Sequence, residues 1–195
     1  MRQQLFLLPL ILFLTGFSNY IYCQSNYYPL EKGQVFTFAF GDDFNNGDSG
    51  LRSKIEFLES TTTINGKEYF VSQNSFGKDG NFTVVGKFYT RIGQNGSIYV
   101  LDSEDSSKES LTLDQPLSVG KSWEQSNMGT NTTVKVVDMN GSIKTPNKTY
   151  SNCLVLESIE QGNTYRSYFQ KDVGSVAITM VVGGEEKVFT YLVNE

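Results

Sequence analysis

The stretch Pro29-Leu30-Glu31-Lys32-Gly33-Gln34-Val35-Phe36 recurs later in the chain as Pro116-Leu117-Ser118-Val119-Gly120-Lys121-Ser122-Trp123. Both stretches follow the pattern P-L-x-x-G-x-x-aromatic. Further along, a second pattern occurs once in each half: a tyrosine followed by a turn and a Gly-Ser-aliphatic triplet. The first copy is Tyr89 with Gly96-Ser97-Ile98, and the second is Tyr168 with Gly174-Ser175-Val176. Such self-similarity is the mark of a repeat. The sequence therefore predicts two duplicated halves, about 27–102 and 114–193, with chance reuse of turn residues as the alternative.

Turn signals separate segments rich in Val, Ile, Phe, Tyr and Thr, which are the residues that pleated strands favour. Hairpin turns are predicted at four glycine-containing pairs: Asn65-Gly66, Asn95-Gly96, Asn140-Gly141 and Gly183-Gly184. No segment has a convincing helical period, and 104–109 is the only candidate for a helical turn. We therefore expect an all-β fold, an antiparallel meander of roughly ten strands that forms a curved sheet, an open barrel or a sandwich.

Alternation within the predicted strands indicates which side chains face the core. Successive side chains of a strand point to opposite faces, so Phe36, Phe38 and Phe40 should share one face. In the late strand 175–182, the predicted buried face holds Val176, Ile178, Met180 and Val182. The segment 188–193 is apolar on both faces, so it should be covered on both sides or line a second hydrophobic space. Trp123, the sole tryptophan, is expected to be buried.

The N-terminus has the layout of a secretory signal peptide. Met1-Arg2 precedes an apolar run from Leu5 to Phe17, which is too short for a membrane span of about 20 residues. We expect a signal peptide at 1–23, a mature N-terminus at Gln24 and a single all-β domain at 24–195. The expected location is secreted or periplasmic. Acylation of Cys23, as in an outer-membrane lipoprotein, is the less favoured alternative because Tyr20 and Tyr22 fit that processing pattern badly.

The composition excludes several functional classes. The net charge of −5, without a basic patch, argues against nucleic acid as a partner. The chain has no histidine, which excludes His-based catalytic triads and His metal ligands. If Cys23 leaves with the signal peptide, Cys153 is the one cysteine left, so neither a disulfide framework nor a Cys/His zinc site is expected. Cys153 is predicted to be a buried apolar thiol.

Acidic clusters are the remaining candidates for chemistry. The loop Asp42–Asp48 offers several oxygen ligands for calcium, but Phe44 occupies a ligand position of the EF-hand pattern, which favours a solvated turn. Asp102, Glu104 and Asp105 could supply paired carboxylates for a hydrolase, although the neighbouring serines favour a solvated loop. Glu185 and Glu186 are expected to be exposed charges at a hairpin tip. We therefore assign no catalytic, cofactor-binding or metal-binding residue.

Three segments resemble a family of small secreted Bacteroidota proteins of unknown function, the TapB-like group. Tyr27–Gly33 resembles its opening Y-[YF]-P-L-K-x-G, Tyr150–Leu154 its T-[FY]-x-x-C stretch, and Tyr168–Val176 its Y-Y-A-K-G-V-G-L-V segment. The resemblance implies a mostly antiparallel β fold in the cell envelope and no established catalytic residues. Two positions depart from the pattern, because Asp172 stands at the usual Gly and Ala177 where a Lys often follows. Asp172 is then expected to tolerate positive φ.

Together, these features favour an exported, non-enzymatic protein that binds a hydrophobic small molecule and needs no cofactor. A structural module that binds an envelope protein through a sheet edge or an aromatic patch is the alternative. A carboxylate-based hydrolase is a remote third. An enclosed apolar cavity would favour the first hypothesis, and a filled core with a flat aromatic patch would favour the second.

Overall fold

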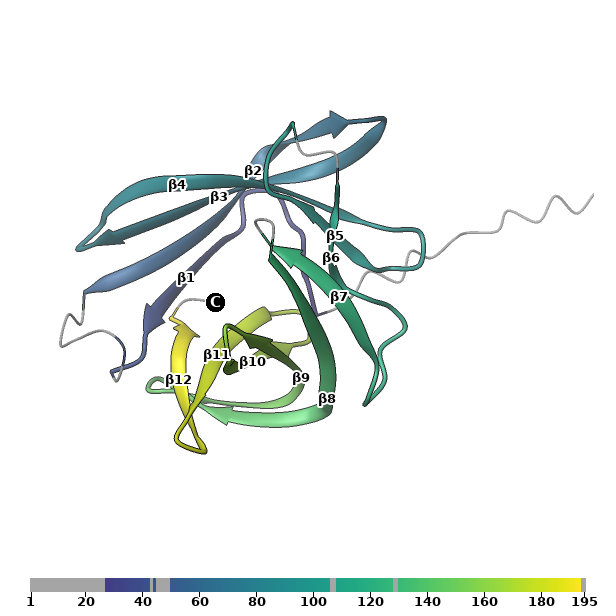
Figure 1. The fold of residues 1–195 in the computed structure, drawn as a ribbon. Helices are drawn as coiled ribbons and strands as arrows, with labels where there is room; N and C mark the ends of the chain where they lie inside the picture. The colour runs from purple at the N-terminus through teal and green to yellow at the C-terminus, as the bar shows by residue number, and fades with distance from the viewer. Residues whose placement is uncertain (1–26, 43, 45–49, 106–107, 128–129, 194–195) are drawn as a thin grey trace, which may run out of the picture.

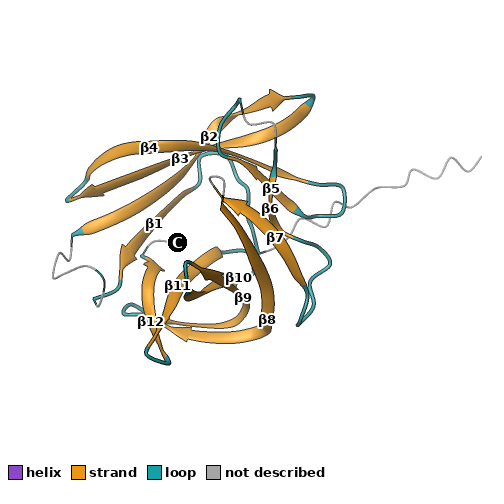
Figure 2. Ribbon diagram, in the orientation of Figure 1, coloured by secondary structure: helices purple, strands orange, loops and turns teal. Residues whose placement is uncertain are grey.

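The computed structural model describes residues 27–193 except 43, 45–49, 106–107 and 128–129. Within these residues the chain forms twelve strands and no helix (Figure 2). The strands are β1 (Val35–Phe40), β2 (Leu51–Ile64), β3 (Lys67–Lys78), β4 (Asn81–Ile92), β5 (Ile98–Leu101), β6 (Ser110–Leu113), β7 (Ser122–Asn127), β8 (Thr130–Lys144), β9 (Thr149–Glu160), β10 (Asn163–Gln170), β11 (Gly174–Val182) and β12 (Glu185–Leu192). No helix in the described part could therefore cross a membrane. The predicted signal peptide, with Cys23 and Gln24, lies outside the described residues.

All twelve strands belong to one antiparallel sheet with the order β6-β5-β4-β3-β2-β1-β12-β11-β10-β9-β8-β7. The sheet curls into a nearly closed barrel (Figure 1). The predicted all-β antiparallel meander is confirmed, with twelve strands instead of about ten. One of the additional strands is β6, which lies between the predicted halves 27–102 and 114–193. The first and last strands of the chain pair with each other, since Phe38 lies opposite Leu192.

The barrel is interrupted between β6 and β7, a junction that we call the seam. These two strands lie at the ends of the sheet order and run side by side in Figure 1. Side chains span the seam where a ladder would otherwise run. The indole Nε1 of Trp123 donates a hydrogen bond to the carbonyl oxygen of Leu111 at 3.1 Å, and the amide of Ser126 donates to the hydroxyl of Ser110 at 3.2 Å.

The first six strands and the last six strands follow the same up-and-down order. Phe36 lies in the first strand of one half and Trp123 in the first strand of the other. Tyr89 lies in β4 and Tyr168 in β10, the fourth strand of each half. The landmarks of the sequence echo therefore fall in matching strands. Common descent of the halves stays a prediction.

The opening turns of the two halves share their hydrogen bonds as well as their sequence pattern. Gly33 has a φ of 75° and Gly120 a φ of 88°, which glycine adopts without the steric cost of a Cβ. The Gly33 amide donates to Phe57 at 2.9 Å, and the Gly120 amide donates to Val136 at 2.8 Å. The reverse bonds, from Phe57 to Gln34 and from Val136 to Lys121, also match at 2.9 and 2.8 Å.

Three of the four predicted hairpins are confirmed. Asn65 and Gly66 join β2 to β3 with φ values of 51° and 75°, and Gly183 and Gly184 join β11 to β12 with values of 62° and 87°. The loop that contains Asn95-Gly96 joins β4 to β5. Asp172 has a φ of 63°, the left-handed conformation expected for it.

The prediction of a turn at Asn140-Gly141 is wrong. This pair lies inside β8, where the register with β9 shifts between Asp138 and Gly141. The amide of Asn140 donates to the carboxylate of Asp138 at 2.9 Å, so a local irregularity absorbs the pair without reversing the strand. Gly141 packs against β9, because a Cβ built there would lie 2.4 Å from Cγ2 of Val155.

The predicted buried face of β11 is also partly wrong. Val176 is fully buried as expected, but Val182 is exposed and Ala177 and Thr179 are fully buried. The register with β12 shifts between Ile178 and Thr179, which breaks the simple alternation of faces. The predicted burial of Trp123 and of Cys153 is confirmed, since they are 7% and 0% exposed. Burial raises the pKa of the Cys153 thiol to about 11.

The apolar cluster around Trp123 takes residues from both halves, so the two halves share this part of the core. Its buried members are Tyr27, Ile98, Leu113, Trp123, Val134, Val136, Leu154 and Leu156. Because each half supplies part of this cluster, either half alone would leave apolar surface in water.

Candidate functional site

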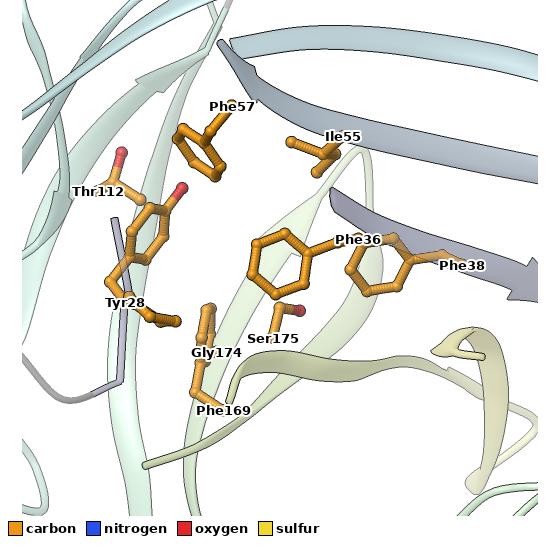
Figure 3. A pocket seen from close by; sticks show the side chains of 10 residues that line it. Tyr28, Phe36, Phe38, Ile55, Phe57, Thr112, Phe169, Gly174 and Ser175 are labelled. Carbon is orange, nitrogen blue, oxygen red and sulfur yellow. The ribbon is translucent and has the colours of Figure 1, made fainter. Parts of the chain in front are cut away.

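A pocket with a volume of about 240 Å³ lies between the two halves. Its walls come from the segment before β1, from β1 and β2, from β6, and from β10 and β11 (Figure 3). The lining residues are Tyr28, Pro29, Phe36, Phe38, Ile55, Phe57, Thr112, Phe169, Gly174 and Ser175. None of these side chains carries a charge, so the pocket is apolar with a few hydroxyl groups.

Strand alternation explains how the first half builds its side of the pocket. Phe36 and Phe38 are two residues apart in β1 and share a face, as the sequence predicted. Ile55 lies directly opposite Phe36 in the register of β1 and β2, and Phe57 follows two residues later. The rings of Phe36 and Phe57 meet edge to face at 6.3 Å between centroids, a favourable geometry for aromatic pairs.

The second half closes the pocket through the turn between β10 and β11. Phe169 stacks on Tyr28 with ring centroids 6.4 Å apart. Gly174 has a φ of 95°, and a Cβ built there would lie 3.1 Å from Cδ of Pro29. A glycine at this position therefore allows the segment of Tyr28 and Pro29 to lie close against β11.

Three hydroxyl groups line the otherwise apolar walls, those of Tyr28, Thr112 and Ser175. Figure 3 shows the Tyr28 ring reaching across the pocket with its hydroxyl on the side of Phe57. Burial raises the pKa of the Tyr28 hydroxyl above its ordinary value. In the part of the chain that the structure describes, none of these three hydroxyls forms a hydrogen bond with another residue.

Two buried amide oxygens have no hydrogen-bond partner in the described residues, those of Gln34 and Asn74. Asn74 lies directly opposite Ile55 in the register of β2 and β3, so the two side chains share a face. Gln34 precedes Phe36 by two residues. Buried polar atoms nearly always have a partner, so the Asn74 oxygen is a candidate contact for a ligand on this strand face.

Polar groups elsewhere in the barrel are paired with one another. The carboxylate of Glu109, just before β6, accepts hydrogen bonds from Arg91 through two nitrogens, from Tyr69 at 2.5 Å and from Lys67 at 2.7 Å. The hydrogen bonds from Arg91 are the main reason that the pKa of Glu109 is lowered to about 2, against the opposing effect of burial. This cluster ties the start of β6 to β3 and β4.

The second half has a comparable cluster around Glu186. Its carboxylate accepts hydrogen bonds from Thr179 at 2.5 Å, Tyr168 at 2.6 Å and Arg166 at 2.9 Å. Burial opposes ionisation, but these hydrogen bonds hold the pKa of Glu186 below its ordinary value. Glu185 and Glu186 are exposed at the hairpin, as the sequence predicted, and Glu186 has a structural role in addition. Its long-range partners on β10 and β11 could not be seen in the sequence.

The fourth strand of each half carries a buried tyrosine that donates to a carboxylate near its half's C-terminal end. Tyr89 donates to Glu104 at 2.8 Å, and Tyr168 donates to Glu186 at 2.6 Å. Burial, followed by the hydrogen bond to Glu104, raises the pKa of Tyr89 to about 12. Glu104 lies in an exposed loop, as the sequence predicted, and this hydrogen bond gives it a structural role as well.

A second pocket, of about 280 Å³, is polar. It is lined by Val137, Asp138, Gly141, Ser142, Val155, Arg166 and Tyr168. Arg166 already forms ion pairs with Glu157 at 3.0 Å and with Glu186 at 2.9 Å. Its charge is thus compensated within the fold, which makes this pocket the weaker candidate for ligand binding.

The candidate metal and hydrolase residues do not assemble into a site in the described residues. Most of the loop Asp42–Asp48 lies outside them, and the described part contains no group of three acidic or cysteine side chains placed to hold a metal ion. The apolar pocket has no carboxylate among its lining residues, and the polar pocket has Asp138 alone.

Two solved structures share the fold at low sequence identity. One is described as a "putative exported protein with YmcC-like fold" from Bacteroides fragilis; it has a TM-score of 0.52 and 10% identity, covering 85% of this chain and 96% of that one. The other is described as a "putative lipoprotein" from Parabacteroides distasonis; it has a TM-score of 0.50 and 12% identity, covering 87% and 97%.

No protein-family model and no curated protein matches the sequence. The TapB-like name is therefore not confirmed. The structural neighbours come from Bacteroidales, which agrees with the Bacteroidota resemblance at the level of the fold.

The sequence motifs did not predict that the residues lining the pocket lie together. Alternation indicated the shared face of Phe36 and Phe38, and the motifs assigned to turns and to family resemblance contained Tyr28, Pro29, Phe169 and Gly174. The link between them is the pairing of β1 with β12, which brings the N-terminal segment to β10 and β11. Recurrence of the P-L and G-S motifs in both halves was the available signal that these segments belong together.

Proposed function

We propose that this protein is exported and acts as a non-catalytic binding module for a small hydrophobic molecule, which it holds in the pocket between its halves. The pocket's apolar, aromatic-rich lining with a few uncharged polar groups is the observation that carries the proposal, because this composition is typical of small-molecule sites. Its volume of about 240 Å³ is below the roughly 300–1,000 Å³ of most such sites. The pocket therefore suits a small ligand or one end of a larger one.

Export is supported by the sequence layout of 1–23 and by the descriptions of the two structural neighbours as exported protein and lipoprotein. Intact-mass measurement of protein from its own envelope separates the two processing routes. A chain that begins at Gln24 supports a free, secreted or periplasmic protein. A diacylglycerol-sized addition on Cys23 would instead establish a lipoprotein.

Binding is tested with a neutral apolar fluorophore, N-phenyl-1-naphthylamine, whose emission rises in a dry site. The wild-type protein should enhance its emission, and Ile55→Phe, which fills part of the pocket, should weaken the enhancement. Val85→Phe is the matched control, because Val85 is 60% exposed and lies outside the pocket lining. Equal enhancement by both variants would show that the fluorophore binds elsewhere. Native mass spectrometry of the purified protein would identify a co-purifying ligand.

A protein-interaction module is the second candidate, and exposed apolar side chains on β3 and β4 favour it. Phe76 is 42% exposed and stacks on Phe40 with ring centroids 6.2 Å apart, while Val84 and Val85 lie nearby in β4. The sheet-edge route is less favoured, because the two edge strands face each other across the seam. Loss of binding to an envelope protein in Phe76→Ser, with fluorophore binding retained, would support this candidate.

A further inference from the structure

The polar groups that line the apolar pocket are all uncharged, and this restricts the chemistry of the ligand. The lining contributes the hydroxyls of Tyr28, Thr112 and Ser175 and no lysine, arginine, aspartate or glutamate. An ionised ligand group in such a site would lose hydration without gaining a counter-charge, which disfavours its binding. A neutral hydrogen-bonding group would instead find partners already in place.

Tyr28 is the residue best placed to bind that group. Its ring is fixed by stacking on Phe169, and its hydroxyl lies within the pocket (Figure 3). This hydroxyl forms no hydrogen bond with another described residue, so it is available to a ligand. A phenol can donate to a carbonyl and accept from an alcohol, so it can serve an ester, a ketone, an amide or an alcohol.

The amide oxygen of Asn74 is another hydrogen-bonding atom that a ligand could contact. It is buried and has no hydrogen-bond partner in the described residues. Its position opposite Ile55 puts it on the strand face that lines the pocket. An acceptor of this kind would repel a carboxylate and would favour a ligand that offers a hydroxyl or amide proton.

We propose that the ligand is an uncharged amphiphile, an apolar chain or ring that ends in a neutral oxygen-containing group, and that Tyr28 binds this group by a hydrogen bond. This inference rests on the proposed function, since it assigns the ligand class of the same pocket. It separates esters and alcohols of fatty chains from the corresponding free acids and amines, which carry a charge at neutral pH.

The test compares methyl octanoate, 1-octanol and octanoate as competitors of N-phenyl-1-naphthylamine at pH 8. The ester and the acid share their chain, so charge is the main difference between them. The ester and the alcohol should displace the fluorophore, and octanoate should bind at least about a hundredfold more weakly. Octanoate that binds as tightly as its methyl ester would overturn the inference while leaving the proposed function intact.

Tyr28→Phe tests the role of the hydroxyl with the ring retained. Affinity for methyl octanoate should fall about tenfold, equivalent to about 1.4 kcal/mol, whereas toluene, which has no hydrogen-bonding group, should bind both proteins equally. Tyr99→Phe in β5 is the matched control and should bind the ester as wild type does. Equal ester affinity in both variants would overturn the assignment of Tyr28. Failure of the fluorophore and of toluene to bind wild type would overturn the proposed function itself, and the inference with it.

Discussion

Glu109 shows how a single side chain can hold several strands in place. Its carboxylate lies just before β6 and is bound by Lys67 and Tyr69 of β3 and by Arg91 of β4. Hydrogen bonds between charged partners are stronger than neutral ones, and Glu109 is mostly shielded from solvent. No motif in the sequence pointed to this role, because the partners of Glu109 lie 18 to 42 residues away.

Glu109 should make the stability of the protein depend on pH in the acid range. Its folded-state pKa of about 2 lies below the value of about 4.3 in an unfolded chain. Its contribution is therefore complete above pH 4.3 and is lost as pH falls toward 2. The loss should be on the order of 3 kcal/mol, because each pKa unit is worth about 1.4 kcal/mol.

Denaturant unfolding of wild type and Glu109→Gln between pH 7 and pH 2 measures this effect. The variant should be less stable than wild type at pH 7, and the difference should shrink as the pH falls. Glu160→Gln, at the exposed end of β9, is the control and should follow the wild-type curve. A stability difference for Glu109→Gln that stays constant with pH would contradict the assignment.

Trp123 should be important for stability through both its ring and its indole nitrogen. The ring packs in the core shared by both halves, so Trp123→Ala should cost about 3–5 kcal/mol. Trp123→Phe keeps an aromatic ring but removes the hydrogen bond to Leu111, and it should cost distinctly less. Denaturant midpoints of the two variants and the emission of wild type provide the measurement. Water-like emission together with an unchanged midpoint in Trp123→Ala would contradict burial.

At the scale of strands and hairpins, short sequence motifs predicted those turns whose conformation depends on the residues of the turn itself. Asn65-Gly66 and Gly183-Gly184 form the expected hairpins, because the conformations that these turns require are set by the residues themselves. Asn140-Gly141 has the same local chemistry but lies within β8. There, pairing with β9 on both sides of Gly141 outweighs the turn preference. The pocket could not be predicted for a similar reason, since its walls come from strands far apart in the sequence.

Gly141 should not tolerate a side chain. A Cβ would lie 2.4 Å from Cγ2 of Val155, so Gly141→Ala should destabilise the protein by about 1–3 kcal/mol, the usual cost of overpacking. The double variant with Val155→Ala should recover part of this loss, because the clash is removed. Gly86→Ala in β4 is a matched strand glycine whose nearest contact would be 3.5 Å, and it should have little effect. Additive losses in the double variant would disprove the proposed clash.

At the scale of the whole molecule, the two halves should depend on each other for folding. The core cluster around Trp123 draws on both, and β1 and β12 form the ladder that joins them. Fragments that cover 24–113 and 114–195 should each lack cooperative thermal unfolding when isolated, and mixing them should restore it. Circular dichroism measures both results. Cooperative unfolding of either fragment alone would show that the half is an independent domain.

Twelve strands in a row have eleven hydrogen-bonded junctions, and the place where the circle stays unbonded lies in the middle of the chain instead of between its ends. The ladder of β1 and β12 therefore joins the two halves on one side of the barrel, and on the other side the seam of β6 and β7 is their unpaired junction. Separation of β6 from β7 would break the hydrogen bonds that the Trp123 indole and the Ser126 amide donate across the seam, and it would break none of the strand ladders. Thr112 of β6 lines the pocket, so the seam lies beside the proposed ligand site.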